Sequence, residues 1–103
     1  ISHGVRRVSW RDSTDAVGDG HALPRTEDTG AFWFFDSENI ELVVKVLDGR
    51  ALNGHFWVFF GSLSNVEFTL TVTDTETSIR KVYVNDLGNF SSNGDVTAFP
   101  APL

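Results

Sequence analysis

The sequence predicts an all-β protein, an antiparallel two-layer β-sandwich of the immunoglobulin-like or Greek-key type with seven to eight strands. Apolar residues alternate with a period of two almost throughout, and no stretch keeps a helical period over three turns. Glycine, proline, asparagine and aspartate separate the alternating segments at the short spacing that is typical of sandwiches. The chain of 103 residues is expected to form one domain over 1–103.

Eight segments carry the alternation in chain order. The clearest covers 66–73, where Phe68 and Leu70 point one way and Thr69 and Thr71 the other, the pattern of a strand with one face on the core. The expected strands are 5–10, 20–23, 30–35, 40–47, 55–60, 66–73, 79–84 and 96–99.

Polar and glycine-containing segments separate the strands. Residues 12–19 are expected to form a loop. The short strand expected at 20–23 ends at Pro24. Asp48-Gly49 and Asn53-Gly54 suit positive φ angles and bracket a short connection. Turns are expected at 36–39, 61–65 and 74–78, and an extended tail at 100–103.

Composition narrows the classes of function. The net charge is −6, which disfavours nucleic-acid binding, and no apolar run is long enough to span a membrane. The absence of cysteine excludes disulfides and Cys-ligated zinc. Arg6, Arg7 and Arg11 lie in an N-terminal segment without acids, so 1–11 is expected to be an edge strand blunted by arginines or a basic arm that docks on an acidic neighbour.

Two strands are apolar on both faces. Trp33 and Phe35 oppose Phe32 and Phe34, and Trp57 and Phe59 oppose Phe56, Val58 and Phe60. Four large aromatic side chains present roughly 600–1,000 Å², more than the largest apolar patch of a typical monomer, about 300–600 Å². We therefore expect something to cover the face that carries Trp33, Phe35, Trp57 and Phe59.

Three covers are consistent with the sequence. The chain itself can hide the second face. Another protein surface can cover it, either an identical subunit or the rest of a larger assembly. A sugar can stack on Trp33 and Trp57, with Asp36, Asn53 or His55 as polar partners.

Catalytic and metal motifs are weak. Gly61-Ser62-Leu63-Ser64 lacks the G-x-S-x-G elbow, and the three histidines have no metal-binding spacing, so we expect no enzyme activity and no cofactor. Two acid-containing loops are candidates for calcium, although such acids commonly bond their own backbone. The calcium candidates are Asp12, Asp15, Asp19, Asp36 and Glu38.

The segment "TGAFWFFDSENIELVVKVLDGRALNGHFWVFFGSLSNVEFTLTVTDTET", with "NDLGNFSSNGDVTAF" after it, resembles an uncharacterised module of secreted proteins from environmental bacteria, often found at their C-terminal end. The resemblance covers about 10–99 and implies export and a structural or accessory β-sandwich without known activity. Gly4, Arg6 and Ser78 depart from the usual pattern of that module. It defines no functional residues to carry over.

These observations predict a secreted, non-enzymatic bacterial β-sandwich that acts through its surface as a subunit of an extracellular assembly or filament. The expected interface combines the aromatic face with the Arg6, Arg7 and Arg11 segment. The alternative is a carbohydrate-binding accessory module.

Overall fold

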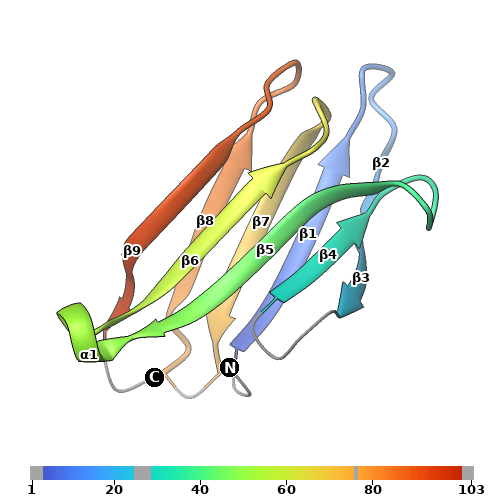
Figure 1. The fold of residues 1–103 in the computed structure, drawn as a ribbon. Coiled ribbons are helices and arrows are strands. Elements are labelled where there is room, and N and C mark those ends of the chain that lie inside the picture. Colours follow the sequence, from blue (N-terminus) through green and yellow to red (C-terminus); the bar gives the residue numbers. More distant parts are fainter. Residues whose placement is uncertain (1–3, 25–28, 76, 101–103) are drawn as a thin grey trace.

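In the computed structural model, which describes residues 4–24, 29–75 and 77–100, nine strands form two antiparallel sheets packed face to face (Figure 1). The predicted all-β sandwich is confirmed. The four-stranded sheet has the order β2-β1-β7-β8, and the five-stranded sheet has the order β3-β4-β5-β6-β9. The elements are β1 Gly4–Arg11, β2 Val17–Asp19, β3 His21–Pro24, β4 Thr29–Trp33, β5 Ile40–Gly49, α1 Arg50–Asn53, β6 His55–Ser62, β7 Glu67–Asp74, β8 Arg80–Asn85 and β9 Ser92–Pro100.

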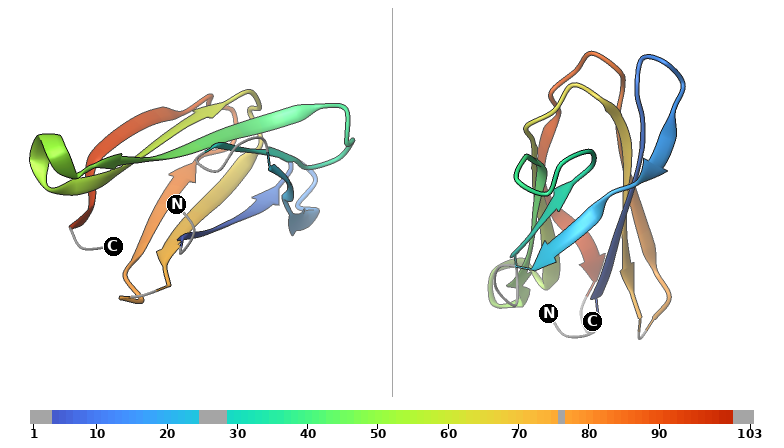
Figure 2. Two further views of the ribbon diagram at one scale, coloured as in Figure 1. Left: turned by 60° about the horizontal axis from the view of Figure 1, so that its bottom comes forward. Right: turned by 90° about the vertical axis from the view of Figure 1, so that its right-hand side faces the viewer.

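The chain changes sheets between β2 and β3, between β6 and β7, and between β8 and β9 (Figure 2). As a result β1 pairs with β7, and β6 pairs with β9, although neither pair is consecutive in the chain. Such non-sequential antiparallel pairing is typical of Greek-key connections. The alternation explains the core, because every second side chain of each central strand points between the sheets.

The core is aromatic and aliphatic, and the even positions of the central strands supply most of it. Phe68, Leu70 and Val72 of β7 are at most 2% exposed, and Thr69 and Thr71 face outward, as their alternation predicts. The buried core residues are Val8, Phe32, Phe34, Leu42, Val44, Val46, Phe56, Val58, Phe60, Phe68, Leu70, Val72, Ala98 and Phe99.

β1 is not an arm, because it pairs with β7 from Gly4 to Arg11, and it is an edge strand only in its first half, because β2 pairs with it only at Ser9–Arg11. β1 lies between β7 and β2, and β2 falls inside the loop predicted for 12–19. The chain can fold back so soon because the Asp12 carboxylate accepts hydrogen bonds from the amides of Thr14 and Ala16, at 2.8 and 3.1 Å. Asp15 takes a positive φ of 65° in this turn. Residues 1–3 lie outside the described residues.

The C-terminal strand is longer than predicted. β9 begins at Ser92 and ends at Pro100, because its polar first half pairs by backbone with β6 at the edge of the sheet. The connection between Gly49 and Gly54 contains the one-turn helix α1, which alternation does not predict. Of the tail expected at 100–103, Pro100 belongs to β9, and 101–103 lie outside the described residues.

Candidate functional site

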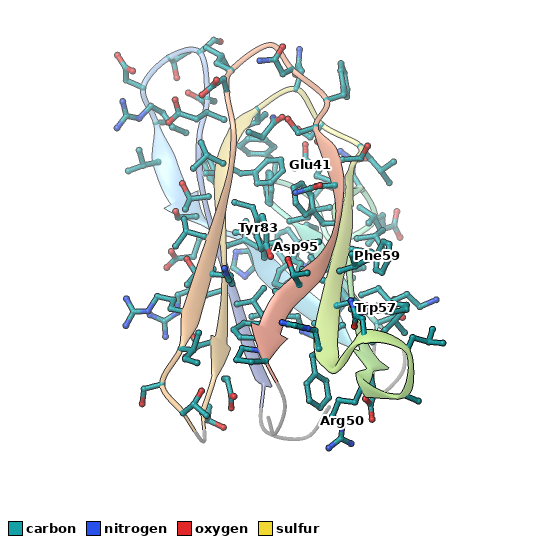
Figure 3. The ribbon with its side chains drawn as sticks, turned by 90° about the vertical axis from the view of Figure 1, so that its left-hand side faces the viewer. Glu41, Arg50, Trp57, Phe59, Tyr83 and Asp95 are labelled. Atoms are coloured by element: carbon teal, nitrogen blue, oxygen red, sulfur yellow. The ribbon has the colours of Figure 1, made fainter. Side chains whose placement is uncertain are left out.

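The outer face of the five-stranded sheet carries an apolar stripe over its middle strands. Val43 and Leu47 of β5 lie next to Trp57 and Phe59 of β6, and all four side chains are half-buried. The rings of Trp57 and Phe59 meet edge to face, with centroids 6.2 Å apart. Figure 3 shows both rings on the outside of the sheet, away from the core. This surface, defined by Val43, Leu47, Trp57 and Phe59, is called the aromatic face below.

Both rings pack closely against glycines of neighbouring strands. Phe59 is directly opposite Gly94 of β9, and a Cβ atom at Gly94 would come within 2.7 Å of the ring. Trp57 covers Gly49 at the end of β5 so closely that a Cβ atom there would overlap the indole. Each ring therefore hides one side against backbone, so the chain itself covers part of the second apolar face.

Asn53 holds the Trp57 indole in this position. Its side-chain oxygen accepts a hydrogen bond from Trp57 Nε1 at 2.9 Å, and its Nδ2 donates to the Val96 carbonyl at 2.7 Å. Asn53 is the last residue of α1, and Gly54 follows it with a φ of 76°. The short helix thus ties the edge strand β9 to the ring on β6.

A shallow groove of about 610 Å³ runs beside Phe59. Val43, Lys45 and Gly61 line it from β5 and β6, and Asn93 and other β9 residues line its opposite side. Lys45 pairs with Phe59 in register and is exposed, so an ammonium group stands within the apolar surface. The groove therefore offers one cation, amide and hydroxyl groups, and one aromatic ring.

The four aromatic residues predicted for the interface do not form one patch. Trp33 pairs with Ile40 and Trp57 with Leu47, so seven residues of β5, or about 24 Å, separate the two indoles along the sheet. The His21 ring stacks on Trp33 with centroids 4.0 Å apart, which occupies one side of that indole.

Phe35 lies at a third place. It follows the end of β4, is 50% exposed, and contacts the Trp10 ring edge to face at a centroid distance of 4.5 Å. Trp10 belongs to the opposite sheet, so Phe35 caps the end of the sandwich instead of extending the aromatic face. Of the predicted set, the structure brings together Trp57 and Phe59.

The three arginines also lie away from the aromatic face. Arg7 and Arg11 are exposed on the outer face of the four-stranded sheet, where Arg11 lies 3.7 Å from the Glu67 carboxylate. Arg6 shares the inward side of β1 with Val8, and its guanidinium lies beside Gly30 of β4. The arginines are therefore not part of one surface with Trp57.

Two of the calcium candidates, Asp12 and Asp36, accept hydrogen bonds within their own turns. The carboxylate of Asp12 accepts the turn hydrogen bonds described above, and the bonds from Thr14 lower its pKa. Asp36 accepts the Glu38 amide at 2.9 Å, and Asp19 lies on β2 in register with Ser9 of β1, in the same sheet. Within the described ranges, no three His, Cys, Asp or Glu side chains come together as a metal site.

A half-buried polar pair closes the side of the sandwich at which β8 and β9 are the edges. The Tyr83 hydroxyl donates to an Asp95 carboxylate oxygen at 2.7 Å, and Figure 3 shows the two side chains pointing toward each other between the sheets. Burial and this hydrogen bond raise the pKa of Tyr83 well above its ordinary value. The sequence does not indicate this contact, because Asp95 follows Asn93-Gly94 and resembles a turn residue.

Asn85 closes the same side of the sandwich, nearer the β8–β9 connection. It is fully buried, and its Nδ2 donates to the carbonyls of Val66 and Asn89 at 2.9 and 2.8 Å. Its side-chain oxygen accepts the Ser91 amide at 2.9 Å. Asn85 therefore fixes the connection between β8 and β9, and the Tyr83–Asp95 bond joins the two strands themselves.

Comparisons with protein-family models, with curated proteins and with solved structures find no match for this chain. Across the described part of the chain, no helix has the length and apolar composition needed to cross a membrane.

Proposed function

We propose that this protein is a secreted, non-enzymatic bacterial structural protein that associates with copies of itself through the aromatic face. The observation that carries the proposal is the difference between the two outer surfaces. The outer face of the four-stranded sheet carries the threonines of β7 and apolar side chains that are aliphatic only, at Val17, Val82 and Val84. The outer face of the five-stranded sheet presents two aromatic rings, Trp57 and Phe59, together with Val43 and Leu47. Aromatic side chains on a sheet face that points away from the core support a role in contact with another surface.

The geometry suits a modest, reversible association. Each ring packs against a glycine of a neighbouring strand, so part of each ring is already hidden. Burying these two rings in an interface gains less free energy than burying four fully exposed rings, because the gain is about 25 cal/mol per Å² of apolar area removed from water. The aromatic face extends over four residues of β5, about 14 Å, and over two strands about 5 Å apart, so it is smaller than the roughly 800 Å² per partner of a standard interface. We therefore expect self-association that grows with protein concentration.

The histidines of the described residues support a non-catalytic role. His21 stacks on Trp33, and Nδ1 of His55 lies 2.9 Å from the Asn53 carbonyl. Both rings thus have structural partners, and neither contacts a serine in a nucleophile-and-base arrangement.

Light scattering across a concentration series tests the proposal. Val43→Lys places a second ammonium beside Lys45 on the aromatic face, and we expect it to lower the weight-average mass of the protein at high concentration. Val17→Lys is the matched control, because Val17 is 67% exposed on the outer face of the other sheet. The proposal is refuted if both variants keep the mass of the wild type, or if the wild type stays monomeric at millimolar concentration.

Glycan binding is the second candidate, and the groove beside Phe59 favours it. The groove combines an aromatic ring with Lys45, Asn93 and a serine hydroxyl, the mixture of groups that sugar sites use. One sugar ring cannot stack on Trp33 and Trp57 together, because they are too far apart along β5. Trp57 lies close enough to Phe59 for its emission to report binding, so a polysaccharide panel without any response removes this candidate.

A further inference from the structure

Three of the four edge strands carry features that obstruct further pairing. β2 has three residues, and β3 has four and ends at Pro24, which lacks an N–H group. The ladder of β9 is interrupted where its register against β6 shifts between Phe56 and Val58. By contrast, β8 pairs with β7 in unbroken register over its six residues, without proline or glycine.

The free side of β8 presents a regular row of backbone groups. Asp74 N–H donates to the Ile79 carbonyl at 2.9 Å, so this pair is of the hydrogen-bonded type. Pairs alternate along an antiparallel ladder, which turns the N–H and C=O groups of Arg80, Val82 and Val84 away from β7. Within the described residues no other strand pairs with this side of β8.

The side chains of these residues lie on the outer face of the four-stranded sheet and have complementary ends. Val82 and Val84 are 54% and 56% exposed, next to the threonines of β7. Arg80 is exposed at one end of β8, and Asp86 is exposed just beyond the other. A strand with a cation at one end and an anion at the other is complementary to an antiparallel copy of itself.

We infer that β8 pairs with β8 of a second copy about a twofold axis, which joins two four-stranded sheets into one continuous sheet. In the inferred register Tyr83 lies opposite itself, Val82 lies opposite Val84, and Arg80 lies opposite Asp86. The valine pairs can exchange both backbone hydrogen bonds, because their N–H and C=O groups face outward.

Other registers lose this complementarity. A shift by one residue places outward side chains against inward ones, which breaks the two faces of the sheet. A shift by two residues in either direction places a valine opposite Arg80 or Asp86. In the inferred register the two Lys81 side chains are offset by about 14 Å along the strands, more than a Debye length, so their repulsion is largely screened.

The inferred β8 interface is distinct from the aromatic face, so a test of one association does not decide the other. Two different twofold contacts on one chain would connect copies into an open row instead of a closed pair. The edge is therefore tested in the Val43→Lys background, where a charge disables the aromatic face.

Sedimentation velocity with charge reversal tests the register. We expect Val43→Lys to dimerise, and we expect adding Arg80→Asp or Asp86→Arg to weaken its dimer at least tenfold, because like charges then meet at both ends. An equimolar mixture of the two reversed proteins should dimerise again, because each cation then faces an anion; this recovery also shows that both variants are folded. A monomeric Val43→Lys protein, an unchanged dimer in either reversed variant, or a mixture that stays monomeric overturns the inference.

Discussion

Substitution by alanine should change the free energy of unfolding in opposite directions at two glycines beside the aromatic face, Gly61 and Gly94. Gly94→Ala adds a methyl group within 2.7 Å of the Phe59 ring, whereas Gly61→Ala adds one where no atom lies within 4 Å. Both glycines belong to neighbouring strands of one sheet, and neither has a positive φ. The backbone therefore tolerates alanine at both, and the difference reports the ring alone.

The expected magnitudes follow from these distances. Alanine stabilises a strand relative to glycine by roughly 0.5–1 kcal/mol, through the entropy of the unfolded chain. Overpacking against the ring costs about 1–3 kcal/mol. We expect Gly61→Ala to raise the free energy of unfolding by up to about 1 kcal/mol, and Gly94→Ala to lower it by about 0.5–2 kcal/mol.

Thermal and urea unfolding followed by circular dichroism measure both effects, at about 4–8 °C of melting temperature per kcal/mol for a chain of this size. Phe59→Ala should remove most of the penalty of Gly94→Ala in a double-mutant cycle, since the methyl group then meets no ring. Equal effects at the two glycines, or a penalty that persists without Phe59, would refute the packing of the ring on Gly94.

Three further predictions concern polar contacts. Tyr83 is the single tyrosine, so the absorbance of ionised phenol at alkaline pH reports on it alone. Its raised pKa keeps the native phenol neutral near pH 10, where the unfolded chain ionises, so its contribution to stability is full below that pH and is lost as pH rises toward the pKa of the folded state. Ionisation of the native protein at the ordinary pKa would contradict the contact with Asp95. Asn85→Ala should lower the free energy of unfolding in urea by about 2–4 kcal/mol, because it leaves buried backbone groups without hydrogen-bond partners. A decrease of less than about 0.5 kcal/mol would contradict the hydrogen bonds of Asn85. The side-chain and backbone hydrogen bonds from Arg50 lower the pKa of Asp48 to about 2, so the stabilisation by this pair is present above about pH 4 and disappears as pH falls through about 2. NMR titration should show the pKa rising toward its ordinary value in Arg50→Gln, which keeps only the backbone bond, and an unchanged pKa would contradict the side-chain pairing.

Alternation along the chain predicts the sandwich because burial on one face dominates the strands with strict patterning. β7 is the clearest example, since Phe68 and Leu70 face the core and Thr69 and Thr71 face outward. In β6 both faces are apolar, so alternation cannot tell which set faces inward. The structure places Phe56, Val58 and Phe60 in the core, in register with the inward residues of β5.

The parts that the sequence does not predict depend on contacts between distant segments. Asn93-Gly94 has the composition of a turn, yet it pairs with β6 and supplies the backbone on which Phe59 rests. The offset between Trp33 and Trp57 arises from the register of β5 with its two neighbours, which local patterning does not encode. The sequence therefore predicts that two strands carry surplus rings, but not that their rings lie at separate places.

The indole N–H resonances measure the role of the aromatic face most directly. Trp57 lies on the aromatic face, whereas the buried Nε1 of Trp10 lies inside the protomer and serves as the internal reference. During dilution from millimolar to micromolar protein, we predict that the Trp57 indole signal moves steadily while the Trp10 signal stays fixed. A Trp57 signal that does not move over this range would contradict the proposed association.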